Sequence, residues 1–304
     1  MSDRVDFEQL TERAMREGGH ARLRPVIQKE LLHYDILYSL DREGLLQALT
    51  FQGGTSLRLC YGANRFSEDL DFVGGREFGR SQLYGIRECI EHHIGRRYGL
   101  EVEVKEPKGL RHQREHAQLS INKWQVAVIT APARSDIPRQ RIKIEVANIP
   151  AYSREPRALR VNYPFLPDGY ADTLVLVETL DEIMADKLVS LVNTTGYVRH
   201  RDIWDLRWLV QQGAAMRVDW VRGKIGDYAV EDYGEKLEHM RKQVSDIIYG
   251  KPFHDELSRF IPQVVVDRTL NRRDFLTMLL RETEDLLTNL QRRLESMDGT
   301  AGDV

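Results

Sequence analysis

Cysteine is scarce in this sequence, which has only Cys60 and Cys89 among 304 residues. Both lie in segments predicted to be helical, and neither has a further cysteine or a histidine at the spacing of a zinc site. We therefore expect two buried free thiols, and neither a disulfide framework nor a structural zinc ion.

Long apolar runs are also missing. No stretch approaches the roughly 20 apolar residues needed to cross a bilayer, and the N-terminus is charged from Asp3 onward, unlike a signal peptide. We expect a cytoplasmic protein without a membrane partner.

An excess of either charge is absent as well, because the formal net charge is only -3. A nucleic-acid partner would have to be held by a local basic patch and not by the overall field of the protein. The hydrophobic share of 41% and the charged share of 30% are typical of a globular chain. At this length we expect one large or two moderate domains.

The most informative stretch is FQGGTSLRLCYGANRFSEDLDFV, residues 51–73. An apolar run from Leu49 to Gln52 ends at Gly53-Gly54, and Thr55-Ser56 then opens a helical segment. Glycines at such a strand-turn-helix junction let backbone N–H groups approach a phosphate, and the helix dipole favours an anion there. Taken alone, the pattern favours an ordinary turn followed by a Ser/Thr N-cap.

Two aspartates follow this turn at i, i+2 spacing. Asp69-Leu70-Asp71-Phe72-Val73 is typical of a strand with Leu70 and Phe72 buried and both carboxylates on the opposite face. A carboxylate pair of this kind is either solvated at a strand end or neutralised by a divalent ion, and oxygen-only ligands suit Mg²⁺ or Mn²⁺. The turn and the two aspartates together favour a metal-nucleotide site.

Further strands are predicted downstream. A helix over Phe78–Tyr98 precedes segments 100–105, 119–130 and 139–148, which alternate or are β-branched, so we expect a mixed α/β sheet. Glu145 lies on the same face of its strand as Arg141 and Lys143, which makes it a candidate third carboxylate. The alternative is a solvated face with cross-strand ion pairs.

Residues 151–172 are predicted to be irregular because they contain several prolines. Arg154, Arg157 and Arg160 alternate there with aromatic residues, so the segment is either an RNA-facing surface or a packed crossing. The first 47 residues are predicted to be helical, with Ile27, Leu31, Tyr34 and Tyr38 as the apolar stripe.

The C-terminal half is predicted to be helical after a last strand at 174–177. In the helix over 178–195, Lys187 lies one residue off the apolar stripe, where a lysine reaches solvent or pairs with Glu182 or Asp186. Asp202 can N-cap the next helix, and Asp205 is placed to pair with Arg201. Charged helices follow from Val218, and the last helix has an apolar seam that we expect to be internal.

Two motifs carry a family resemblance. GGTSLRLCYGANRFSEDLDF resembles the signature segment of the AbiEii/MenT-like nucleotidyltransferase toxins, a branch of the polymerase-β-type nucleotidyltransferase superfamily. EIMADKL followed by RDIWDL resembles the second motif of that family. The match covers roughly residues 45–210 and implies an α+β fold, in which helices flank a mixed sheet and a C-terminal helical bundle follows. We expect a nucleotidyltransferase domain at 1–177 and a helical domain at 178–304 that completes the active site.

The resemblance also implies a function, a toxin that transfers NMP from an NTP to the 3′ end of tRNA and so blocks aminoacylation and translation. A cognate antitoxin would restrain it. Mg²⁺ or Mn²⁺ would bind Asp69, Asp71 and Glu145, while Lys187 would contact the triphosphate and Asp202 would be required at the active site. The remaining candidate NTP contacts are Gly53, Gly54, Thr55, Ser56, Arg58, Arg65 and Ser67.

Three alternatives stay open at this point. The same site could transfer a nucleotide to a protein or a small molecule. It could instead transfer a phosphoryl group, with attack on the γ-phosphorus. The third alternative is a non-catalytic nucleotide- or RNA-binding module, against which the presence of all three acidic candidates and the lysine counts.

Overall fold

The structure is a computed structural model of the chain and describes residues 4–18, 23–107, 119–134, 136–167, 169–194 and 196–300. Its internal contacts divide the chain into two compact units, Met1–Glu178 and Thr179–Val304, called unit 1 and unit 2 here. Each unit is described by itself.

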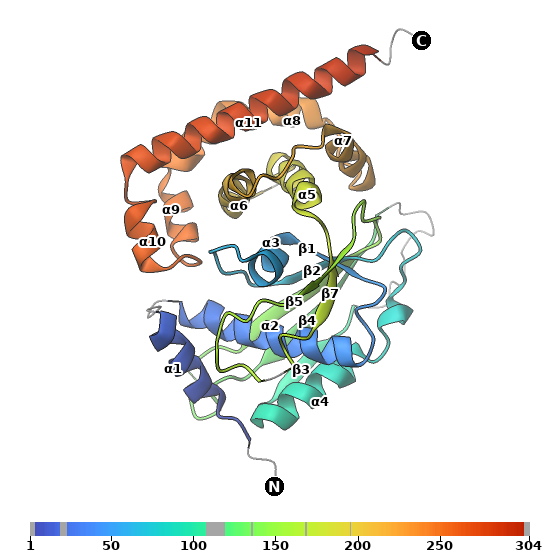
Figure 1. Cartoon of the computed structure of the whole chain (residues 1–304), viewed down its shortest axis with the longest axis vertical. Coiled ribbons are helices and arrows are strands. Elements are labelled where there is room, and N and C mark those ends of the chain that lie inside the picture. Colours follow the sequence, from blue (N-terminus) through green and yellow to red (C-terminus); the bar gives the residue numbers. More distant parts are fainter. Residues whose placement is uncertain are drawn as a thin grey trace. The chain divides into compact units, whose positions relative to one another are not determined.

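Unit 1 contains a mixed sheet with helices, as shown in Figure 1. Its elements in chain order are α1 (Phe7–Gly18), α2 (Arg24–Arg42), β1 (Thr50–Gln52), α3 (Gly53–Ser56), the π-helix η1 (Leu57–Tyr61), β2 (Leu70–Val73), the 3-10 helix η2 (Arg80–Leu83), α4 (Ile86–Tyr98), β3 (Val102–Lys105), β4 (Ile121–Val128), β5 (Gln140–Ala147), β6 (Glu155–Ala158) and β7 (Leu174–Val177).

The described strands form one sheet in the order β3-β4-β5-β2-β1-β7-β6. β2 runs parallel to β5 and β1 runs parallel to β7, whereas the other neighbouring pairs are antiparallel. The predicted α+β fold with a mixed sheet is therefore confirmed. β2, which follows Asp69, lies at the centre of this sheet with β1 and β5 on its two sides.

The two faces of the central strands differ in polarity. Leu70 and Phe72 of β2 are buried, as are Ile144 and Val146 of β5. Helices α2 and α4 contact each other, and they also contact β5 and β3 respectively, as Figure 1 shows. The predicted stripe of α2 is confirmed, because its members Ile27, Leu31 and Tyr34 are buried and Tyr38 is half-buried. Alternation along each strand sends the charged residues to the opposite face.

Two predictions for unit 1 were wrong in detail. The helix expected over 78–98 is broken, because Gly85 adopts φ +95, and only η2 and α4 form. Gly99 ends α4 in the left-handed conformation, as a glycine C-cap does. The segment 151–172, expected to be irregular, contains the short strand β6. Pro156 lies within it, which is possible because β6 is an edge strand.

Unit 2 consists of helices in the part that the structure describes. They are α5 (Leu180–Val192), α6 (His200–Gln211), α7 (Val218–Asp227), α8 (Tyr233–Tyr249), α9 (Lys251–Leu257), α10 (Gln263–Arg268) and α11 (Arg273–Thr300). The long helix α11 packs along α8 and also contacts α6 and α7. Leu279, Thr283 and Leu290 are buried in this packing, so the seam of α11 is internal, as predicted.

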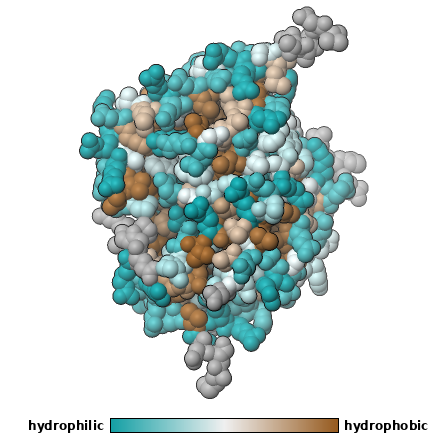
Figure 2. Space-filling view, viewed as in Figure 1, coloured by the Kyte–Doolittle hydropathy of each residue, from teal (hydrophilic) through white to brown (hydrophobic). Residues whose placement is uncertain are grey.

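Other expectations from composition can be compared with the structure. Cys60 and Cys89 are both free thiols, Cys60 being buried. Among the described residues, no helix has both the length and the apolar character of a membrane span. On the face drawn in Figure 2, hydrophobic side chains appear as scattered patches between hydrophilic ones.

Candidate active site

The candidate acids of unit 1 lie on the polar face of the sheet. Asp71 of β2 is the direct register partner of Glu145 on β5, and Asp69 immediately precedes β2. The flanking register pairs, Leu70 with Ile144 and Phe72 with Val146, are buried on the other face. Strand alternation therefore brings Asp71 and Glu145 together, because both strands have the same phase.

Two of these acids form ion pairs with lysines. Asp69 Oδ1 accepts a hydrogen bond from the Lys143 backbone N–H at 2.9 Å, and Lys143 Nζ lies 3.8 Å from Asp69 Oδ2. Lys123 Nζ lies 3.0 Å from Glu145 Oε1. The cross-strand ion pair considered as the alternative for Glu145 is thus present. Glu145 would therefore bind a metal ion only after Lys123 has moved away.

The donor set on this face fits a hard divalent cation, because it consists of carboxylate oxygens from Asp69, Asp71 and Glu145. The close packing of the Gly53-Gly54 turn against Asp71 is also consistent with a metal-nucleotide site, since only glycine leaves room there. The oxygens of the three acids are not gathered as tightly as in a preformed site. Among the described residues, the group of three whose ligand atoms all lie within 4.8 Å of one another is a different one, formed near the start of α5.

The Gly53-Gly54 turn packs directly on the acidic face. Gly53 has φ +78, and a Cβ added to it would lie 2.9 Å from Asp71 Oδ2. A Cβ on Gly54 would overlap Arg65 Nη2 and lie 3.1 Å from Ser67 Oγ. The turn requires glycine for both reasons, backbone conformation and close approach. It brings the backbone of residues 53–54 next to Asp71, Arg65 and Ser67.

Thr55 and Ser56, which were also predicted to contact phosphate, form hydrogen bonds within unit 1. The hydroxyl of Thr55 donates to the carbonyl of Asp69, and that of Ser56 donates to the carbonyl of Gly53 at 2.9 Å. Both side chains are buried. In this conformation both hydroxyl groups already donate to backbone carbonyls. The donors left for a phosphate are therefore the backbone N–H groups of the turn.

Arg58 has a structural role. Its Nε donates to Glu30 Oε2 at 2.8 Å and its Nη2 donates to Glu30 Oε1 at 3.1 Å. The guanidinium also stacks 4.4 Å from the ring centroid of Phe66. Burial alone would lower the pKa of Arg58, but the ion pair with Glu30 raises it above the ordinary value. Arg58 is therefore committed to α2. Arg65 is buried at the turn, where its Nη1 donates to the Phe66 carbonyl at 2.8 Å.

The arginines of residues 151–172 also pack within unit 1. Arg157 stacks 4.2 Å from the ring centroid of Tyr61 and pairs with Glu155 at 2.6 Å. Arg154 donates to the carbonyl of Gln47, and Arg160 lies against Gly62. These contacts are the packing that a crossing segment would make, while Arg154 and Arg160 remain exposed.

In unit 2, Lys187 of α5 lies between two carboxylates of α6. Lys187 Nζ donates to Asp202 Oδ1 at 2.6 Å and lies 3.0 Å from Asp205 Oδ2. Ser190 Oγ donates to the second oxygen of Asp202 at 2.6 Å. The side chain of Lys187 is only 12% exposed, so its position is fixed by this network. The motif residues Lys187 and Asp202, separated by fifteen positions in the sequence, are direct partners.

The structure corrects two expectations about this region. α6 begins at His200 with Arg199 as its N-cap residue, so Asp202 lies in the first turn and does not cap the helix. Lys187 pairs with Asp202 and Asp205 of α6, whereas Glu182 and Asp186 pair with Lys224. Lys224 Nζ lies 2.7 Å from Glu182 Oε1 and 3.2 Å from Asp186 Oδ2.

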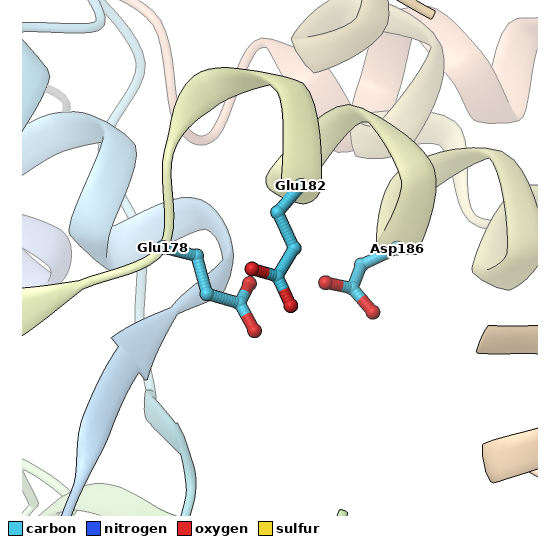
Figure 3. A group of neighbouring side chains, drawn as sticks. All are labelled: Glu178, Glu182 and Asp186. Carbon is cyan, nitrogen blue, oxygen red and sulfur yellow. The ribbon is translucent and has the colours of Figure 1, made fainter. Parts of the chain in front are cut away.

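Sequence reasoning missed the acidic group made by Glu178, Glu182 and Asp186. Figure 3 shows their carboxylates turned toward one another along the continuous segment that enters α5. The spacing i, i+4, i+8 was the available signal. Lys224 of α7, which is fully buried, supplies a cation to Glu182 and Asp186. We interpret the pairs of Lys224 with Glu182 and Asp186 as a buried ion network that stabilises unit 2.

Comparisons with known proteins identify the family of this chain. The family model described as nucleotidyl transferase AbiEii toxin, type IV toxin–antitoxin system, matches residues 35–295. MenT4, a nucleotidyltransferase toxin from Mycobacterium tuberculosis, has a similar structure with a TM-score of 0.58 at 20% identity, covering 95% of this chain and 92% of that one. JHP933 from Helicobacter pylori gives a TM-score of 0.46 at 18% identity, covering 91% and 96%. A search of curated proteins gave no match.

The likeness to MenT4 concerns the fold, whereas the family model spans most of the chain, including both motifs. The sequence resemblance is thereby confirmed. This chain belongs to the AbiEii family of nucleotidyltransferase toxins of type IV toxin–antitoxin systems.

Proposed function

We propose that this toxin transfers NMP from an NTP to the 3′ end of tRNA, which blocks aminoacylation and so stops translation. The observation that carries the proposal is the pairing of Asp71 with Glu145 beside the Gly53-Gly54 turn. It supports the proposal because two carboxylates lie beside backbone N–H groups that would bind a phosphate. The choice of tRNA as acceptor rests on the family resemblance of the two motifs. Such a toxin would act in the cytoplasm and be restrained by a cognate antitoxin.

Asp69 and Asp71, with Glu145 once Lys123 has moved away, are the residues that would hold Mg²⁺ or Mn²⁺. When bound, the metal ions would lower the pKa of the attacking hydroxyl and neutralise charge on the triphosphate. Before binding, Lys143 and Lys123 keep the negative charges of Asp69 and Glu145 compensated. The two lysines are about half exposed and so are free to follow a phosphate once the acids have another partner.

The chain's own groups would position the nucleotide. The backbone N–H groups of Gly53 and Gly54, together with Ser67, would hold the terminal phosphates, because they lie at the same turn. Arg65 is buried beneath this turn and donates to the Phe66 carbonyl at 2.8 Å, so it would support the turn. The acceptor hydroxyl would then attack the α-phosphorus in line, and the bond from that phosphorus to the β-phosphate oxygen would break, releasing pyrophosphate.

Lys187 would neutralise the charge that builds up on the pyrophosphate as it leaves. Asp202 and Asp205 fix the ammonium group of Lys187, and Ser190 fixes Asp202. We assign Asp202 this positioning role.

The proposal is tested by incubating the purified protein with Mg²⁺, total tRNA and each NTP labelled on its α-phosphate. Asp71→Asn and Lys187→Met serve as site variants, and Asp219→Asn, an exposed aspartate paired with Arg217, is the matched control. We expect label on tRNA with the wild type and the control but not with the site variants.

Label on protein or on a small molecule would overturn the choice of tRNA. Transfer of a γ-label, with no α-label transferred, would show phosphoryl transfer. NTP binding without release of pyrophosphate in the presence of any acceptor would indicate a non-catalytic module.

A further inference from the structure

A cavity of about 660 Å³ in unit 2 is not used by the proposed reaction. It lies between the segment that joins α5 to α6 and the N-terminal half of α8. Its lining includes Tyr197 from the joining segment and Asp232, Lys236 and Gln243 from the region of α8. A cavity of this volume is within the range of small-ligand sites.

Tyr197 gives this cavity an aromatic surface that is open to solvent. Its side chain is 66% exposed, and the guanidinium of Arg199 lies 5.6 Å from its ring centroid. An aromatic ring beside an arginine is the combination that binds single-stranded nucleic acid, because the ring stacks on a base while the arginine reaches a phosphate.

The wall opposite offers both donors and acceptors. Lys236 Nζ donates to Asn193 Oδ1 at 3.1 Å, which holds the ammonium group in place at the cavity. Asp232 and Glu235 provide carboxylate acceptors, and Gln243 provides an amide that is both donor and acceptor. A mixture of donors and acceptors of this kind matches the edge of a nucleobase. It suits a phosphate less well, because the acidic residues would repel it.

The cavity is also close in the chain to Lys187 and Asp202, the two residues of this unit that the resemblance to the family singles out. Val192, in its lining, follows Lys187 by five helical residues, about 7.5 Å along the axis of α5. Arg199 precedes Asp202 by three positions. A nucleotide at Lys187 and a base in the cavity are therefore within the reach of one short RNA strand.

We propose that this cavity binds an unpaired nucleobase of single-stranded RNA, stacked on Tyr197, with Arg199 on the adjoining phosphate. The inference rests on the proposed function for the identity of the RNA as the acceptor strand. It adds a site that holds the acceptor at a base next to its reacting end.

The test measures binding of a fluorescent single-stranded RNA of about ten nucleotides by anisotropy, across a range of salt concentrations. Tyr197→Ala should weaken binding about tenfold or more without changing its salt dependence, because stacking releases no counterions. Arg199→Ala should weaken binding and reduce the salt slope by about one. Tyr197→Trp should retain the affinity.

Tyr249 supplies the matched control. It is also an exposed tyrosine of unit 2 and lies beside an arginine, Arg273, at 5.8 Å, but it is outside the cavity lining. Tyr249→Ala should leave RNA binding unchanged. Thermal melting of each variant checks that the fold is intact, which we expect because both rings are exposed.

Three results would overturn the inference. The first is unchanged RNA affinity in Tyr197→Ala, or an equal loss in Tyr249→Ala. The second is a wild type that does not bind the RNA. The third is a loss of affinity for a fluorescent NTP in Tyr197→Ala without a loss for RNA, which would make the cavity a free-nucleotide site.

Nucleotide transfer to RNA is measured in parallel, so that the two proposals can fail separately. RNA binding that depends on Tyr197 without any transfer would support the cavity and contradict the proposed reaction. Nucleotide transfer together with an RNA affinity that does not depend on Tyr197 would support the proposed reaction and contradict the role of the cavity.

Discussion

Asp71 and Glu145 lie side by side on parallel strands, at the same register position of β2 and β5. Their backbones are therefore held about 4.8 Å apart by the sheet and not by flexible loops. The side chains before and after them are buried on the other face. A one-residue slip of either strand would bury its carboxylate, so the position of this pair is determined by the core of unit 1.

The first prediction concerns metal binding. Asp71→Asn should weaken binding of Mn²⁺ by at least about tenfold, because it removes a charged oxygen ligand from the sheet face. Glu145→Gln should have a smaller effect, since Glu145 is shared with Lys123. Free Mn²⁺ is measured by electron paramagnetic resonance, with Asp219→Asn as the control. Equal affinities in all four proteins would exclude this face as the metal site.

The second prediction concerns the turn at Gly53. Gly53→Ala should destabilise the protein by about 1–2 kcal/mol, because φ +78 is strained for alanine. It should also reduce nucleotide transfer, because the new Cβ would press on Asp71. Gly75→Ala is the matched control, since Gly75 has φ +83 but open space around it.

Gly75→Ala should therefore lose a similar amount of stability in urea unfolding and keep its activity. If both variants lose activity to the same extent, strain alone accounts for the effect and the contact with Asp71 is irrelevant.

The third prediction concerns the ion pair of Lys187 and Asp202. Lys187→Met should destabilise the protein by about 3–5 kcal/mol, because it removes the cation that faces two buried carboxylates. Asp202→Asn should cost less, because Lys187 keeps its ion pair with Asp205. The double variant should cost less than the sum of the two. Urea unfolding of the four proteins measures the coupling. Additive losses would mean that the two charges do not interact in solution.

The fourth prediction concerns Lys224. Lys224→Met removes the cation that faces Glu182 and Asp186 in a fully buried position, so the free energy of unfolding should fall by several kcal/mol. Lys242→Met is the control, because Lys242 is exposed and makes only an i, i+4 pair with Glu238. If the two variants unfold at the same urea concentration, the buried network does not stabilise unit 2.

The fifth prediction concerns pH. Burial lowers the pKa of His33 to about 4, although its hydrogen bond to the Glu68 carbonyl and the nearby charges of Glu30 and Asp69 act in the opposite direction. Because the unfolded chain binds this proton at pH 6.5 and the folded chain does not, stability should fall as pH decreases from about 6.5 to 4, by about 3 kcal/mol at most.

The His33 contribution is measured from the urea midpoint at a series of pH values. His33→Gln, which keeps a donor for the Glu68 carbonyl, should show a shallower dependence over that interval. Parallel curves for the two proteins would mean that His33 is protonated in the folded state.

Local patterns predicted much of unit 1. Alternation placed Asp71 and Glu145 on the polar face, and the observed register of β2 and β5 agrees with it. Gly53-Gly54 was recognisable as a turn, because glycines end the apolar run before it. β6 was missed because prolines argue against a strand, and its position at an edge becomes apparent only from the complete sheet.

The partners of charged side chains could not be predicted in the same way. Lys187 was expected near Glu182 or Asp186, which are close in the sequence, but the packing of α5 against α6 gives it Asp202 and Asp205. The acids near Lys187 instead pair with Lys224 of α7. Such choices depend on which helices pack together, and no short pattern in the sequence specifies that.

The proline of β6 has a consequence for how the toxin can be bound. Pro156 has no N–H group and lies exposed in an edge strand of the sheet. An incoming strand from an antitoxin, or from a second copy of the toxin, would find one hydrogen-bond donor missing from the row that it must match. Strand addition at this edge is thereby disfavoured, so a partner that binds here would have to recognise the toxin through side chains.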